Sequence, residues 1–368
     1  MKISVVCLAS RSGGGLAILK DLYAYAAEVD SENQWQFVLS DQFLGTSTLN
    51  VEIVNAAPEY KGWWSRIRAE FTTGRRAVSR FDPDIVLSLQ NVDTPARSRY
   101  PLAVYMHQAL PFQKDYRLSF VKREERKLAW RQYLLKLPIV LSSKRSSVTF
   151  VQTHWLARNL KESVPDGNIV AVGHSEVSKQ ADERPEPREP DHFFYPASGT
   201  PYKNHRTLHQ ALRALNERGV DLTGKVAVTL TQQQLVEATG LDLCSELEWY
   251  RPLGWLTQAE VFEEYRSSIL VFPSLVESLG LPLYEARNIG IPIIAGDTEF
   301  GREALDSYPN ATWFDATDPE ALADAMQGSL GESKPSRLED PLETRPFVPW
   351  ERMLEELEVV TKNHGVGK

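Results

Sequence analysis

The sequence predicts an α/β protein made of two Rossmann-like domains, and three observations indicate this. The chain opens on an apolar strand at residues 2–9, followed by glycines and an amphipathic helix that places Leu16, Leu19, Tyr23 and Ala26 on one face. Short apolar runs then alternate with helical segments in both halves. A polar stretch with three prolines, residues 178–191, separates the halves as a linker would.

Composition suits a soluble protein of two domains, since 42% of the 368 residues are hydrophobic and 24% are charged. We find no secretory signal and no apolar run near the ~20 residues of a membrane helix. Cys7 and Cys244 are too few for a disulfide framework, so we expect a reducing cytosol. Residues 1–175 carry a net charge of +7 and the remainder −15, which together give −8.

In the first half, further strands are predicted at residues 35–40, 51–54, 85–89, 102–106, 148–153 and 169–172, with a helix at 66–80. Asp82 and Asp84 have the spacing of a metal-binding Asp-x-Asp pair. We reject that reading because the pair precedes a strand, whereas ligands of open α/β sheets bind beyond the strand ends.

The second half starts with a strand ending near Pro196 and a helix at residues 206–218, followed by a strand at 226–231. Thr257 and Glu260 form a capping box that begins a helix reaching Arg266. Strands at 269–272 and 291–295 enclose a short helix that Pro282 starts and Gly290 ends. Later helices are expected at 318–326 and 350–362.

The stretch from 269 to 297 predicts a ligand site. Glu277 lies in the loop and Glu285 on the helix, while the amides of residues 279–283 face the strand ends without partners. Such a helix start binds phosphate, and flanking carboxylates bind hydroxyl groups. A ligand with both features is a nucleotide sugar.

Glu277 and Glu285, separated by seven residues with Ser-Leu-Gly-Leu-Pro between them, resemble the signature of retaining GT-B glycosyltransferases, more narrowly of family four. The resemblance is strong over residues 193–326 and weaker before them. It implies an acceptor-binding domain at 1–177, a linker at 178–191 and a nucleotide-sugar domain at 192–349. In such proteins a final helix, here 350–368, often packs back on the first domain.

The resemblance also implies roles for residues of the second domain. Lys203 corresponds to a lysine that binds the donor diphosphate, Glu277 to the residue that holds the sugar and Glu285 to the ribose ligand. The remaining donor-site positions are Ser278, Leu279, Gly280, Leu281, Ser198, Trp255 and Leu256. Trp255 and Leu256 match the loop whose backbone holds the nucleobase. Ser198 is a departure, because many relatives carry an arginine there, and either the helix start or Arg206 would compensate.

In the first domain, His107 follows a strand and matches a histidine that contacts the transferred sugar; the alternative is a histidine bonded within its own loop. Gly14 and Gly15 lie in a glycine loop that either approaches the substrates or is only a tight turn. His154 and Trp155 open a helix, where core packing is the better account.

Residues 114–145 carry ten basic and three acidic side chains, interleaved with aromatic residues. A solvated helix face explains this pattern, and so does contact with the anionic inner face of a membrane or with a lipid-diphosphate acceptor. No nucleic-acid module surrounds the segment, so we expect no nucleic-acid partner.

The resulting expectation is a cytoplasmic, metal-independent enzyme without a cofactor, peripheral to the membrane. It transfers a hexose-type sugar from a nucleoside diphosphate to a glycan or lipid-linked acceptor in bacterial polysaccharide or lipopolysaccharide synthesis. Two alternatives remain. One is a non-hydrolysing nucleotide-sugar epimerase, although we find no set of acids and bases for C2 of the sugar. The other is a non-catalytic nucleotide-sugar-binding subunit, which only Ser198 favours.

Overall fold

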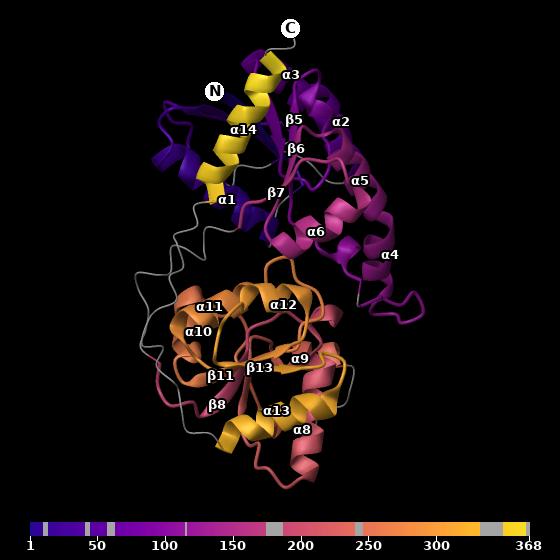
Figure 1. Ribbon diagram of the computed structural model, residues 1–368, viewed down its shortest axis with the longest axis vertical. Coiled ribbons are helices and arrows are strands. Elements are labelled where there is room, and N and C mark those ends of the chain that lie inside the picture. Colours follow the sequence, from indigo (N-terminus) through magenta and orange to yellow (C-terminus); the bar gives the residue numbers. More distant parts are fainter. Residues whose placement is uncertain are drawn as a thin grey trace. The chain divides into compact units, whose positions relative to one another are not determined.

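A computed structural model describes residues 1–9, 14–40, 45–56, 63–114, 116–173, 187–239, 246–331 and 349–365. The chain divides into two compact units, each built on a parallel sheet (Figure 1). Unit 1 comprises Met1–Gln113, Leu128–Ser175 and Phe347–Lys368, and unit 2 comprises Lys114–Lys127 and Glu176–Pro346. The predicted fold class, two Rossmann-like domains, is confirmed.

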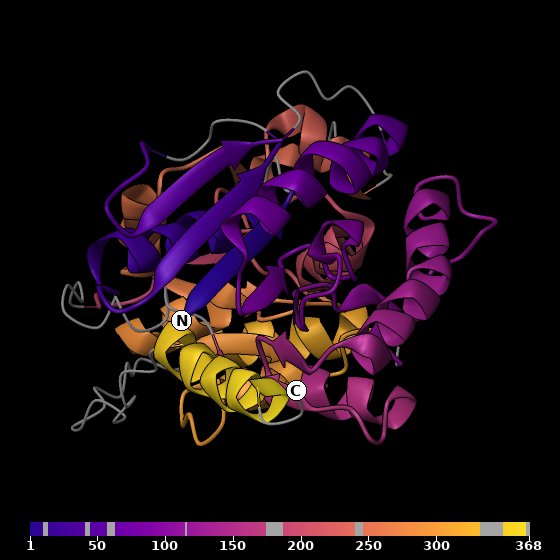
Figure 2. The ribbon, with the colours of Figure 1, turned by 90° about the horizontal axis from the view of Figure 1, so that it is seen from above.

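Unit 1 contains a seven-stranded sheet in the order β3-β2-β1-β4-β5-β6-β7, and all its neighbouring strands are parallel. In Figure 2 the indigo and purple strands run side by side in one direction. The strands are β1 (Lys2–Cys7), β2 (Gln34–Leu39), β3 (Val51–Asn55), β4 (Ile85–Ser88), β5 (Leu102–Met106), β6 (Val148–Val151) and β7 (Ile169–Ala171).

The helices of this part of the chain are α1 (Gly14–Glu28), α2 (Trp63–Ala69), α3 (Arg75–Phe81), α4 (Arg126–Leu134), α5 (Lys136–Arg145), α6 (His154–Ser163) and α14 (Pro349–Gly365). A π-helical turn, η1 (Glu70–Gly74), joins α2 to α3, and η2 (Pro95–Arg97) and η3 (Leu110–Phe112) are 3₁₀ turns. The predicted helix at 66–80 is therefore real but contains a π segment. Among the described residues, no helix is long and apolar enough to cross a membrane.

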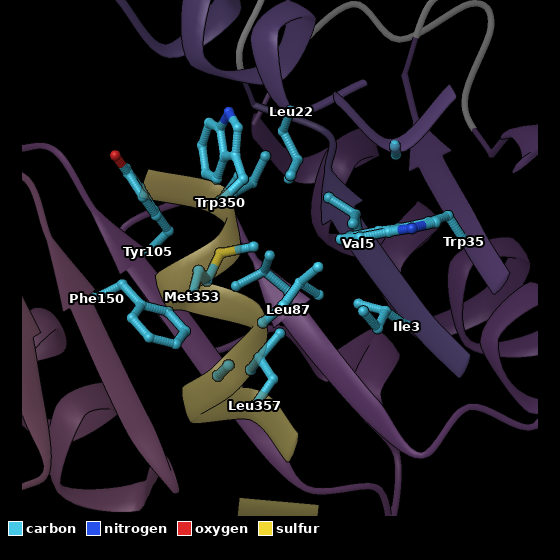
Figure 3. Close-up of a cluster of buried hydrophobic side chains, with 14 of the residues drawn as sticks. Ile3, Val5, Leu22, Trp35, Leu87, Tyr105, Phe150, Trp350, Met353 and Leu357 are labelled. Atoms are coloured by element: carbon cyan, nitrogen blue, oxygen red, sulfur yellow. The ribbon is translucent and has the colours of Figure 1, made fainter. Parts of the chain in front are cut away.

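The core of unit 1 includes the last described helix. Trp350, Met353 and Leu357 of α14 are at most 4% exposed and pack among side chains of the first strands (Figure 3). The Trp350 indole also donates a hydrogen bond of 2.7 Å to Asp21 of α1. Residues more than 300 positions apart thus close one hydrophobic core.

Unit 2 contains a six-stranded parallel sheet in the order β10-β9-β8-β11-β12-β13. Its strands are β8 (His192–Tyr195), β9 (Val226–Val228), β10 (Tyr250–Pro252), β11 (Ser268–Phe272), β12 (Ile293–Gly296) and β13 (Ala311–Phe314). Its helices are α8 (His205–Glu217), α9 (Gln232–Thr239), α10 (Gln258–Tyr265), α11 (Leu281–Ile289), α12 (Glu299–Ala304) and α13 (Pro319–Gly331), with 3₁₀ turns η4 (Pro201–Lys203) and η5 (Leu247–Trp249).

The strand order of unit 2 identifies where a ligand would bind. From β8 the chain moves outward through β9 and β10, and it then returns to the other side of β8 to add β11, β12 and β13. The order therefore reverses between β8 and β11. In open α/β sheets, ligands bind beyond the carboxyl ends of the strands at such a reversal.

Two sequence interpretations change in the structure. Gly14 and Gly15 are the first two residues of α1 rather than part of a loop; residues 10–13 lie outside the described residues. Residues 114–127 group with unit 2, whereas the sequence places them in the first domain. Their contacts explain the grouping, since Glu124 pairs with Arg206 of α8 at 3.5 Å.

Asp82 and Asp84 form hydrogen bonds at the turn that leads into β4. Asp82 ends α3 in a left-handed conformation at φ 52° and accepts a hydrogen bond from the Tyr100 hydroxyl. Asp84 accepts a hydrogen bond from the backbone N–H of Lys2 at 2.7 Å.

Candidate functional site

An ion pair lies at the strand reversal of unit 2. Lys203 follows β8, Glu277 follows β11, and the Lys203 ammonium contacts Oε1 of Glu277. Both side chains are largely buried, at 17% and 12% exposure. Ser274 donates a hydrogen bond of 2.7 Å to the same Glu277 oxygen. The structure therefore brings together two of the predicted catalytic residues and adds a serine that the sequence analysis missed.

Asn204 forms hydrogen bonds that connect the loop of Lys203 to the loop of Glu277. It adopts the left-handed conformation at φ 62°, which turns the chain from η4 into α8. Its side-chain amide donates hydrogen bonds to the carbonyls of Pro273 and Ala316, at 3.1 and 2.8 Å. Lys203 and Glu277 are thus positioned by bonds between loops that are distant in sequence.

The start of α11 lies beside Glu277. Gly280 precedes the helix at φ 76°, a left-handed conformation that favours glycine, and a Cβ at this position would lie 3.8 Å from Cγ of Glu277. Glycine carries no side chain that could cap the helix amides, and Pro282 lies in the first turn as predicted. The expectation of unpaired amides over residues 279–283 needs correction, because the Leu283 N–H donates to the Gly280 carbonyl at 2.9 Å and Pro282 has no N–H. Ser278 and Leu279 precede Gly280 in the loop, and Leu281 is the first residue of the helix. An anion would find both the helix dipole and the Lys203 ammonium here.

Glu285 lies further along α11 and is only 6% exposed. Its Oε2 accepts a hydrogen bond of 2.9 Å from the hydroxyl of Tyr265, the last residue of α10. Burial, followed by the charge of Glu285, raises the pKa of Tyr265 well above its usual value, so the phenol stays protonated and donates. Tyr265 therefore fixes the carboxylate orientation, a role that no local sequence pattern reveals.

The remaining donor-site positions follow β8 and β10 of the same sheet. Ser198 is exposed after β8, and its hydroxyl lies 2.9 Å from that of Thr200. Trp255 follows β10 and is 85% exposed, while Leu256 beside it is half-buried. Gly254, at φ 71°, turns the chain before them, and its N–H donates to the carbonyl of Leu230.

In unit 1, His107 follows β5 and is held by Asn91, which follows β4. The backbone N–H of His107 donates to Oδ1 of Asn91 at 2.7 Å, and Nδ2 of Asn91 lies 3.3 Å from Nε2 of the ring. Nδ1 is buried and has no hydrogen-bond partner among the described residues. Burial lowers the pKa of His107 to about 4, so the ring is neutral at pH 7.

Gly14 and Gly15, the other predicted residues of this unit, begin α1 after β1. A Cβ added at Gly14 would meet no described atom within 4 Å. Packing against the described residues of unit 1 therefore does not explain a glycine at position 14. Among the residues that the structure describes, no three His, Cys, Asp or Glu side chains gather as metal ligands would.

Comparison with solved structures identifies the architecture. Sucrose-phosphate synthase from Thermosynechococcus elongatus superimposes with a TM-score of 0.62 at 14% identity, covering 99% of this chain and 97% of that one. The lipopolysaccharide outer core galactosyltransferase WaaB gives 0.60 at 14% identity, with 96% and 99% covered. The fold is GT-B. Residues 176–338 also match the family model described as Glycosyl transferases group 1.

The GT-B fold is shared with another class of enzyme. UDP-GlcNAc 2-epimerase from Methanocaldococcus jannaschii superimposes with a TM-score of 0.58 at 15% identity, covering 98% of this chain and all of that one. At such identities the likeness concerns the fold alone. No curated protein sequence matches the chain.

Proposed function

We propose that this protein is a retaining glycosyltransferase of family four. It transfers a hexose-type sugar from a nucleoside diphosphate to a hydroxyl of a glycan or lipid-linked acceptor. One observation carries the proposal: Lys203 and Glu277 form a buried ion pair across the strand reversal, beside the start of α11. This arrangement lies in the unit that matches the glycosyltransferase family model.

The chemistry of the pair suits a nucleotide sugar. A ligand that separates an ammonium from a carboxylate must satisfy both, because each is largely buried. Phosphate oxygens do this for Lys203, and sugar hydroxyls do it for Glu277. A simple phosphate would leave the Glu277 carboxylate beside another anion.

Lys203 and the start of α11 bind the negative charge of the donor diphosphate. Arg206 does not compensate for Ser198, because its guanidinium already has other partners. Its Nε donates to the carbonyl of Thr239 at 2.9 Å, and its Nη2 pairs with Glu124. Ser198, which is neutral, supplies at most a hydrogen bond. The dipole of α11 and one ammonium then stabilise the charge that develops on the leaving diphosphate, and the proposal needs no metal or cofactor.

For the nucleoside, we assign Glu285 to the ribose hydroxyls and the loop of Trp255 and Leu256 to the base. The exposed indole of Trp255 adds a flat apolar surface on which a base can stack. In unit 1 we assign contact with the transferred sugar to His107, and an acceptor-side role to Gly14 and Gly15.

The reaction breaks the bond between the anomeric carbon and a diphosphate oxygen. The acceptor oxygen forms a bond to the same face of that carbon, and the leaving phosphate oxygen takes the acceptor's proton. Glu277 orients the sugar, and no residue acts as a covalent nucleophile in this scheme. The configuration at the anomeric carbon is retained.

Binding and turnover together test the proposal. Calorimetry with UDP, GDP, ADP and dTDP identifies the base, and turnover of the matching nucleotide sugars with a mixed acceptor pool follows transfer. Lys203→Ala should weaken binding and abolish most turnover, whereas Lys225→Ala, which removes a lysine bonded to the Asp191 carbonyl, is the control. Chelation by EDTA should leave the rate unchanged. Absence of nucleotide binding would refute the proposal.

Product analysis separates the two alternatives. The structural likeness to a UDP-GlcNAc 2-epimerase favours testing epimerisation directly, by NMR of the nucleotide sugar after incubation without acceptor. If the product is inverted at C2 of the sugar, the protein is an epimerase and not a glycosyltransferase. Tight nucleotide-sugar binding without any turnover would indicate a non-catalytic subunit.

We place the enzyme on the cytoplasmic side, in bacterial polysaccharide or lipopolysaccharide synthesis. The likeness of fold to a lipopolysaccharide galactosyltransferase supports that setting. Acceptor pools prepared from lipid-linked and soluble glycans would test it, since only the former should be elongated if the acceptor is lipid-linked.

A further inference from the structure

The helices α4 and α5 expose large hydrophobic side chains that an ordinary surface helix would bury. The buried residues of these helices are Ala129, Gln132, Ile139, Ser142 and Ser143, of which only Ile139 is large and apolar. Their outward side carries five large hydrophobic residues, which are Trp130 (53% exposed), Tyr133 (42%), Leu134 (59%), Leu137 (65%) and Leu141 (41%). A helix that only packs against its own unit shows the opposite pattern.

The five exposed side chains form one continuous stripe because α4 and α5 are effectively one helix. Backbone bonds from Leu135 to Arg131 and from Ile139 to Leu135, both 3.2 Å, keep the helical i→i−4 pattern across the junction. Pro138 lacks the N–H that would bond to Leu134, which accounts for the interruption. Positions 130, 133, 134, 137 and 141 then share one helix face.

The charges around this stripe are of one sign. Residues 126–145 contain six basic side chains and no acidic one: Arg126, Lys127, Arg131, Lys136, Lys144 and Arg145. Arg131 and Lys144 are exposed. Aromatic and leucine side chains between cations are the composition of helices that lie in the boundary of an anionic bilayer. An acidic protein partner would match the charges but would not explain why the apolar stripe is exposed.

We propose that the α4–α5 face, defined by Trp130, Tyr133, Leu134, Leu137 and Leu141, inserts into the surface of an anionic lipid bilayer. Its basic neighbours bind the lipid headgroups. The site is narrower than the basic segment recognised in the sequence, since Lys122 instead pairs with Glu125 at 3.1 Å. Figure 1 shows α4 and α5 along one flank of unit 1. The inference is independent of the proposed glycosyl transfer.

Vesicle co-sedimentation of the full chain tests the proposal. Binding to vesicles with 30% phosphatidylglycerol should exceed binding to pure phosphatidylcholine and should fall with salt. Leu134→Ser with Leu137→Ser should weaken it by about a hundredfold or more, because each of the two buried leucines contributes about 1.5–3 kcal/mol. Arg131→Gln with Lys144→Gln should weaken it by about fivefold for each charge removed, from about 1 kcal/mol per basic residue.

Val359→Ser is the matched control, because Val359 is an exposed apolar residue of α14 in the same unit. It should bind vesicles as the unchanged chain does, and equal thermal unfolding temperatures would show that all variants fold. Vesicle binding that is unaffected by the leucine or the arginine and lysine changes would overturn the proposal. So would a dimer in solution that the leucine changes convert to monomers, because the face would then join two copies of the chain.

Discussion

Asn91 holds both the backbone and the ring of His107. A backbone N–H is always a donor, so the bond from His107 N identifies the Asn91 atom that accepts it as Oδ1. The other amide atom is then the NH₂ group, which donates toward Nε2. A neutral ring that accepts at Nε2 carries its proton on Nδ1. His107 therefore offers a hydrogen-bond donor from a buried position.

Changing Asn91 to Asp should alter the protonation of His107. The carboxylate still accepts from the backbone but cannot donate to Nε2, so the ring either moves its proton to Nε2 or becomes charged. We expect the pKa of His107 to rise from about 4. Nitrogen-15 NMR of the ring measures both the tautomer and the pKa. An unchanged tautomer in Asn91→Asp would contradict the assignment.

Lys203→Ala should lower kcat by about 10²–10³-fold, because one charge-assisted contact to the transition state contributes roughly 2.7–4 kcal/mol. The loss should appear in kcat more than in KM, since the diphosphate gains charge only as it leaves. Steady-state kinetics with the identified donor provide the measurement. A full wild-type kcat would remove Lys203 from the catalytic role.

Glu277→Gln should measure what the negative charge of Glu277 contributes to sugar binding while the shape of the side chain is kept. The amide keeps the size of the side chain but leaves the Lys203 ammonium without its partner. We expect weaker sugar binding together with retained binding of the bare nucleoside diphosphate, measured by calorimetry. Equal losses for both ligands would show that Glu277 supports the site rather than the sugar.

Tyr265→Phe should raise the KM for the donor without removing Glu285. The change deletes the hydroxyl that orients the buried carboxylate, and the lost bond should destabilise unit 2 by about 1–3 kcal/mol. Calorimetric unfolding and donor titration measure the two effects. A destabilised protein with an unchanged donor KM would show that Glu285 does not bind the nucleoside.

Two histidines should give pH effects of opposite sign. Burial lowers the pKa of His107, so unfolding takes up a proton below pH ~6.5 and stability falls as pH drops from about 6.5 toward 4. For His192, burial opposes the charge, but hydrogen bonds to Glu264 and Asp191 outweigh it and raise the pKa. Its stabilisation is fully present below about 6.5 and disappears as pH rises through the folded pKa.

Variants identify which histidine causes each effect. His192→Gln should flatten the loss of stability above pH ~6.5, and His107→Gln should flatten the loss below it. Urea unfolding across the pH range measures the slopes. If His192→Gln leaves the upper range unchanged, the ion pairs with Glu264 and Asp191 do not hold a proton there.

The sequence identified elements whose boundaries depend on local chemistry. The strand at 102–106 is apolar throughout, and Thr257 with Glu260 forms the expected capping box. Pro282 and Gly290 lie at the start and end of α11 for the reasons that predicted them. By contrast, β10 has only three residues, one of them Pro252, which is too short for a periodic signal.

The site was predicted less completely, because its supports are contacts between distant residues. Lys203 and Glu277 could be named singly, but their pairing joins positions 74 residues apart. Tyr265 acts through its hydroxyl and Asn91 through both atoms of its side-chain amide, and neither residue lies in a recognisable motif. Gly14 and Gly15 were interpreted as part of the glycine loop between the first strand and the helix, yet α1 begins with them.

The position of α14 in the core of unit 1 has a consequence for the order of folding. A ribosome makes residues 187–331 of unit 2 before it makes Trp350, Met353 and Leu357, which complete the hydrophobic core of unit 1. Until these residues are made, part of the apolar surface of the first strands therefore remains exposed. During synthesis, the second half of this chain can mature before the first, and a premature stop near residue 349 would harm the unit that was translated earliest.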